Sequence, residues 1–280
     1  MKFYFSKKTT LICVVLALLC LRASYWQWNR YNQKLEYIDK LKSNLKLPKQ
    51  DLSSILSNDQ KTDIIHRKAL IEGEFDFSQE MVIRNRQHNE ERGAFVITPL
   101  KLKNSDQYIL VNRGFLPFLL ATKEKRKEYQ TTKEFKCICL LKESNPRRFL
   151  SPKDEAKVGE KRIDSWLRVD LEEMQKQLPY KILPYYAEIL SEDINATIDL
   201  SLVEKEMVKS SAGKEELFFL PSRRILNSTD FDHSTLPIPV FSTVIPPGRH
   251  LGYVYEWIII GAAILLIGLL LQFRGKKFTY

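Results

Sequence analysis

Two long apolar stretches, one near each end of the chain, dominate its hydrophobic pattern. Residues 257–271 contain no charge, and the apolar stretch 253–273 covers the roughly 20 residues that a membrane-spanning helix needs. A second stretch at residues 9–28 is interrupted only by Arg22, whose long side chain can reach the membrane surface. The pattern predicts transmembrane helices at 9–28 and 253–273, with residues 29–249 forming one domain between them.

The first apolar stretch also resembles a signal peptide, because it follows Lys7 and Lys8 and has a short apolar core. Its candidate cleavage site, Leu-Arg-Ala before Ser24, lacks the small-x-small pattern that such sites show. We therefore favour an uncleaved membrane anchor.

Beyond residue 28, apolar positions recur at steps of three and four residues. This spacing predicts that the first helix continues as an amphipathic helix, which Pro48 ends. The positions that carry the pattern are Trp28, Tyr31, Leu35, Ile38, Leu41 and Leu45.

Along most of the domain, apolar and polar residues alternate as they do in β-strands. Gly73 and Gly114 mark turns or bulges within this region, and Asp170 is placed to cap a short helix. The fold class that follows is α+β: two terminal transmembrane helices flanking a largely antiparallel, β-rich extracytoplasmic domain. The predicted strands are 66–77, 80–87, 93–102, 107–117, 134–143 and 180–190.

Charge sets the orientation of the chain. The protein has 44 Lys and Arg against 34 Asp and Glu, a formal net charge of +10, but it has no nucleic-acid-binding motif. Anionic lipid is the partner that this charge favours. Basic residues lie on the terminal side of both apolar stretches, so both termini are expected in the cytoplasm. These residues are Lys7, Lys8, Arg274, Lys276 and Lys277.

The expected location is a bacterial inner membrane. A mitochondrial inner membrane is disfavoured because no amphipathic, Ser- and Arg-rich transit peptide precedes the first apolar stretch.

Catalytic signatures are absent from the sequence. It contains no nucleophile elbow, zincin motif, P-loop or dinucleotide-binding loop, and its histidines at 66, 88, 233 and 250 are scattered. We expect no enzymatic turnover, and we expect His66 and His88 at the surface.

Cys137 and Cys139 share one face of a strand. They could bind a soft metal such as copper(I), but a core-filling role is favoured.

Several motifs, in order along the chain, resemble the Surfeit-locus family of cytochrome c oxidase biogenesis factors. The first motif follows the first apolar stretch at Trp26, Gln27, Arg30 and Lys34. A second, with Phe115 in place of the usual Trp, comprises Asn112, Arg113, Gly114 and Pro117. The last opens the second apolar stretch with His250, Leu251, Tyr253 and Trp257, preceded by Arg249 where the family commonly has Asn.

The resemblance implies a factor that assists insertion of haem a into subunit I of the haem-copper oxidase, with subunit I and other assembly factors as partners. It implies transient haem a binding through His250 as iron ligand, which suits neutral imidazole, with Tyr253 and Trp257 flanking the porphyrin. Arg113 could pair with a haem propionate or a partner carboxylate; a role in fixing the fold is slightly preferred. The alternative function is a two-span extracytoplasmic haem-binding or sensor protein.

Overall fold

The computed structural model describes residues 2–57, 64–88, 91–130, 134–195, 236–239 and 247–274. The chain divides into two compact units. Among the described residues, one unit comprises 2–40 and 247–274, and the other comprises 41–57, 64–88, 91–130, 134–195 and 236–239.

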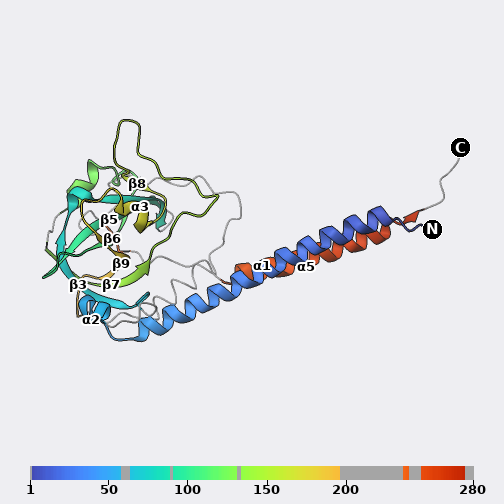
Figure 1. The fold of residues 1–280 in the computed structure, drawn as a ribbon, viewed down its shortest axis with the longest axis horizontal. Coiled ribbons are helices and arrows are strands. Elements are labelled where there is room, and N and C mark those ends of the chain that lie inside the picture. Colours follow the sequence, from blue (N-terminus) through green and yellow to red (C-terminus); the bar gives the residue numbers. More distant parts are fainter. Residues whose placement is uncertain are drawn as a thin grey trace. The chain divides into compact units, whose positions relative to one another are not determined.

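Two long helices make up most of the first unit (Figure 1). Helix α1 runs from Lys7 to Lys46 without a break, so the predicted amphipathic continuation is confirmed, and it ends two residues before Pro48. Helix α5 spans Pro247–Leu270. Both helices are long and apolar enough to cross a membrane. The short strands β1 (Lys2–Phe3) and β10 (Phe273–Arg274) pair antiparallel, so the two helix ends that carry them lie together.

Small residues let α1 and α5 pack closely side by side (Figure 1). A Cβ atom built on Gly261 would lie 3.3 Å from Cys20 Cβ, and one built on Gly268 would overlap Cys13 Sγ. Ser24 also donates a hydrogen bond to the carbonyl of Val254, at 3.1 Å. Lipid chains are as apolar as these helices, so close packing and interhelical hydrogen bonds are what hold such a pair together.

The second unit is built on one twisted, eight-stranded sheet in the order β2-β3-β7-β9-β6-β5-β4-β8. Strand β3 also pairs with β5, which closes β3, β7, β9, β6 and β5 into a barrel. Most pairings are antiparallel, as predicted; β2–β3, β6–β9 and β4–β8 are parallel. The strands are β2 (Gln50–Asp51), β3 (Lys68–Phe75), β4 (Met81–His88), β5 (Glu91–Leu102), β6 (Tyr108–Pro117), β7 (Glu134–Glu143), β8 (Ser165–Trp166) and β9 (Ile182–Ser191).

Alternate side chains of the barrel strands fill its interior, and the short helix α2 (Leu52–Ser57) adds Leu52 and Ile55 to the same core. Cys137 and Cys139 belong to this core, fully buried with their sulfur atoms 3.0 Å apart. Burial raises the pKa of Cys139 well above its ordinary value, which keeps the thiol protonated. A protonated, enclosed thiol is a poor metal ligand, so the geometry fits the core-filling role.

A second core lies over β4, β5 and β6 and is covered by helix α3 (Leu171–Gln175). As predicted, Asp170 caps this helix by accepting a hydrogen bond from the amide of Glu173. Phe115 is fully buried here, and Gly93 leaves the space that its ring occupies. The core therefore accommodates Phe115, the residue at which the second motif departs from the family pattern.

Candidate functional site

The first and last sequence motifs meet where α1 and α5 pack together. Gln27 is buried, and its Oε1 atom lies 2.9 Å from Nδ1 of His250. The two residues are 223 positions apart in sequence, and only the antiparallel packing of the two helices joins them. We refer to this end of the helix pair, formed by Gln27, Arg30, Lys34, Arg249 and His250, as the helix mouth.

The hydrogen bond between Gln27 and His250 selects one form of the imidazole ring. An amide oxygen can only accept a hydrogen bond, so Nδ1 of His250 must carry the proton and donate it to Gln27. In the neutral ring the lone pair then remains on Nε2. A ligating histidine is normally oriented in this way, by a partner on its other nitrogen.

Positive charge surrounds His250. Lys34, Arg30 and Arg249 all lie close enough to act on it electrostatically. Arg30 also covers the ring of Trp26, with its guanidinium carbon 5.6 Å from the ring centroid. The helix mouth therefore combines an imidazole lone pair with three cationic side chains. Such a site suits an anionic ligand that contains a metal: the lone pair can bind the metal, and the cations can pair with the anionic groups.

The aromatic residues of the last motif lie beside this site. Tyr253 is partly buried and Trp257 is 37% exposed, one and two turns along α5 from His250. Trp26 is half-exposed, whereas its neighbour Gln27 is buried. These rings offer apolar surface of the kind that Trp and Tyr typically provide where a helix enters a membrane.

The second motif forms a β-bulge in β6. Val96 is paired with Gly114 and Ile97 with Asn112, so Arg113 is the extra residue. The bulge confirms the turn or bulge predicted at Gly114, which has φ +127° and whose amide donates to Oδ1 of Asn112 at 3.1 Å. Pro117 closes the strand opposite Gly93. The bulge turns the side chain of Arg113 toward a buried carboxylate.

That carboxylate belongs to Glu80, whose side chain is 1% exposed. Arg113 donates to Glu80 Oε2 at 3.0 Å and to the carbonyl of Tyr129 at 2.7 Å. Its guanidinium also lies 5.3 Å and 5.1 Å from the ring centroids of Phe75 and Phe77. Burial lowers the pKa of Arg113, and Glu80 acts against that effect. These contacts agree with the preferred role of Arg113 in fixing the fold.

Sequence reasoning missed the rest of this network. The highly charged stretch 121–133 predicts a solvated helix or loop, but Arg126 within it is buried in the 3-10 helix η2 (Lys125–Tyr129). It donates to Glu80 at 3.2 Å and pairs with both carboxylate oxygens of Asp164. Thr98 and Gln130 complete the hydrogen bonds to Glu80, at 2.8 and 2.9 Å. The sequence pattern does not distinguish Arg126 from its neighbours, because they are equally charged.

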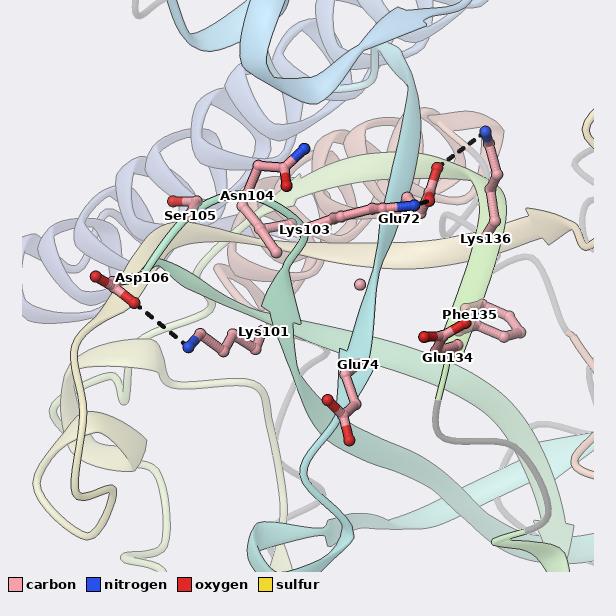
Figure 2. A pocket seen from close by; sticks show the side chains of 12 residues that line it. Glu72, Glu74, Lys101, Lys103, Asn104, Ser105, Asp106, Glu134, Phe135 and Lys136 are labelled. Carbon is pink, nitrogen blue, oxygen red and sulfur yellow. Dashed lines mark hydrogen bonds and ion pairs between the residues drawn. The ribbon is translucent and has the colours of Figure 1, made fainter.

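A cavity of about 740 Å³ lies beside strands β3, β5 and β7 (Figure 2). Ion pairs line it: Glu72 binds both Lys103 and Lys136, and Lys101 lies 3.3 Å from Asp106. Hydrogen bonds from Lys103 and Lys136 lower the pKa of Glu72, so this carboxylate stays ionised near neutral pH. It is therefore unsuited to donate a proton in acid–base catalysis.

The histidines and acidic residues of the described ranges do not form a metal cluster: within these ranges, no three His, Cys, Asp or Glu side chains gather to hold an ion. The surface position expected for His66 is wrong, since this residue is buried with φ 69°. His88 packs against Phe115, with ring centroids 5.6 Å apart. His233 lies outside the described residues. His250 lies close to three cations, Lys34, Arg30 and Arg249.

Comparison with known sequences gives a match over most of the chain. The sequence model of the SURF1 family matches residues 14–262, which include all three motifs, the helix mouth and the Glu80 network.

Individual relatives match shorter regions. A SURF1-like protein of Rickettsia bellii is 26% identical over 192 residues, which cover 67% of this chain and 73% of the relative. A SURF1-like protein of Caenorhabditis elegans is 31% identical over 37% of this chain and 38% of the relative. The cytochrome oxidase assembly protein SHY1 of Saccharomyces cerevisiae is 23% identical over 51% of this chain and 38% of its own length. The matched region thus spans well under half the length of two of these relatives.

Proposed function

Because the chain belongs to the SURF1 family, we propose that it is a membrane-anchored assembly factor for cytochrome oxidase that assists insertion of haem a into subunit I. The yeast relative carries oxidase assembly in its name. The observation that supports the finer step is the contact between Gln27 and His250. It joins two family motifs at one site whose chemistry suits an iron porphyrin.

The donor set at the helix mouth fits haem as a cargo. His250 offers Nε2 to iron, and a histidine nitrogen is a common axial ligand of haem. Arg30, Lys34 and Arg249 supply positive charge for the propionates, while Tyr253 and Trp257 supply apolar surface. Iron would contribute a Lewis-acidic centre for the imidazole. The role of this chain is to bind and orient the cargo before transfer, and we propose no catalytic turnover.

A haem-binding or sensor protein unconnected with the oxidase would share the helix mouth. It would not need subunit I or other assembly factors as partners. The haem a content of the oxidase separates the two functions. If the chain is an assembly factor, cells that lack it should contain oxidase with less haem a; if it is not, the haem a content of the oxidase should not change.

Replacement of His250 tests the ligand assignment. In His250→Ala, haem retained by the purified full-length protein should fall strongly, and haem a in the oxidase of the same cells should fall with it, because the axial ligand is lost. Absorption spectra of the protein and of the membranes measure the two effects.

His250→Gln is the matched control, because glutamine can still donate a hydrogen bond to Gln27 but is a poor ligand for iron. If His250 only holds the helices together, His250→Gln should keep its haem, and the ligand assignment is then wrong. A His250→Ala protein that binds haem normally while the oxidase fails to assemble would place His250 at a protein partner instead.

Orientation in the membrane is a separate prediction. We propose a bacterial inner membrane with both termini in the cytoplasm. The antiparallel pairing of β1 with β10 supports the placement of both termini on the same side of the membrane. A reporter that is active only outside the cytoplasm should be active when fused after Lys125 and silent when fused after Tyr280. The opposite pattern would exclude this orientation.

A further inference from the structure

A turn at Arg148–Ser151 exposes two large apolar side chains. The amide of Ser151 donates to the carbonyl of Arg148 at 2.9 Å, so Phe149 and Leu150 occupy the two corner positions of the turn. They are 94% and 90% exposed. Turn corners usually carry Gly, Pro, Asn or Asp, so two adjacent large apolar residues at this position are not explained by the turn itself.

Contacts at both ends of the segment hold this turn in place. Before the turn, the amide of Asn145 donates to the carbonyl of Val169, and the amide of Arg147 donates to Asp170. After it, the carboxylate of Asp154 accepts from the amide of Leu167 at 2.9 Å and pairs with Arg84 at 3.0 Å. The loop is thus anchored to the domain on either side of its apolar tip.

The chain on either side of the tip is basic, and the acidic side chain of Glu173 lies close enough to act electrostatically on Arg147 and Lys153. Between residues 146 and 153 the chain has Arg147, Arg148 and Lys153 and no acidic residue. The nearest acidic side chain in sequence, Asp154, is 7% exposed and is paired with Arg84. Apolar side chains flanked along the chain by cations match the interface of an anionic bilayer, where acyl chains lie just below negative headgroups.

We propose that the Phe149–Leu150 tip inserts into the surface of an anionic lipid bilayer. The chain's own apolar helices, α1 and α5, keep a bilayer at high effective concentration near the domain. A bilayer also accepts an apolar tip without requiring a complementary pocket, whereas a protein partner would have to supply one. The tip is a second membrane contact of the chain, independent of the helix mouth and of haem.

The test uses the full-length protein in nanodiscs that contain phosphatidylglycerol. Cys13 and Cys20 are replaced by Ala, while the buried Cys137 and Cys139 are kept. A single Ser151→Cys substitution then carries an environment-sensitive fluorophore next to the intact tip. Lipids with brominated acyl chains should quench this fluorophore, and aqueous iodide should not. Arg148→Gln should lower the ratio of inserted to free tip by about fivefold, since one cation near the anionic surface is lost.

Val158 provides the matched control position. It is fully exposed in a second turn of the same loop, Lys157–Glu160, whose ends carry opposite charges. A fluorophore at Val158→Cys should stay accessible to iodide, and Phe149→Ser with Leu150→Ser should make the Ser151 label accessible too. The proposal fails if brominated lipids do not quench the Ser151 label, or if quenching survives the double serine substitution. Shielding of the label that requires added oxidase subunits would assign the tip to a protein partner and overturn the lipid assignment.

Discussion

Glu80→Gln is expected to destabilise the β-rich unit by about 3–5 kcal/mol, the usual cost of leaving buried charges without their partner. The carboxylate of Glu80 accepts from Arg113, Arg126, Thr98 and Gln130. Glutamine has nearly the same volume, so the change removes charge and two acceptor positions without opening a cavity. Arg126 would keep its pairing with Asp164, whereas Arg113 would lose the carboxylate with which it pairs. Thermal unfolding of the full chain in detergent should show the loss, and its abundance in membranes should fall.

The exposed pair of Glu173 and Lys176 serves as the control. Its two side chains are 51% and 62% exposed, and water screens such pairs strongly. Glu173→Gln should therefore unfold at the parental temperature. Equal melting temperatures for Glu80→Gln and the parent protein would show that the network contributes little to stability.

A set of glycine substitutions is expected to separate backbone strain from steric overlap. Gly114→Ala should be the most damaging, because its φ of +127° is strained for alanine and its Cβ would overlap the carbonyl oxygen of Ile238. The strain alone is worth about 1–3 kcal/mol. The overlap adds to it, because Ile238 is hydrogen-bonded to Phe115 in both directions and cannot move freely. The loss is measured as a lower melting temperature and lower abundance.

Two other glycines isolate the individual effects. Gly159 has φ +87° with open space around its Cα, so Gly159→Ala should show the strain alone. Gly73 has no strained φ, but a Cβ there would overlap the carbonyl oxygen of Lys101 where β3 closes the barrel against β5. Gly73→Ala should show the overlap alone. If Gly114→Ala is no worse than Gly159→Ala, the contact with Ile238 does not constrain the bulge.

Local patterns were enough to predict most of the secondary structure. An apolar stretch of about 20 residues specifies a candidate membrane helix by its own composition, and alternation specifies a strand because successive side chains point to opposite faces. The predicted strands at 66–77, 80–87, 93–102, 107–117, 134–143 and 180–190 correspond to β3, β4, β5, β6, β7 and β9. The bulge at Gly114 and the cap at Asp170 were likewise local properties.

Only the tertiary structure decided which of these elements meet. Barrel closure through β3 and β5, the burial of His66 and the ion pairs of Arg126 depend on contacts between residues distant in sequence. The candidate site shows the same limit. The sequence placed Gln27 and His250 in separate motifs, and the packing of small residues along α1 and α5 brought them within hydrogen-bonding distance. A pattern along one element records which face it buries, but the partner of that face is set by the lowest free energy of the whole chain.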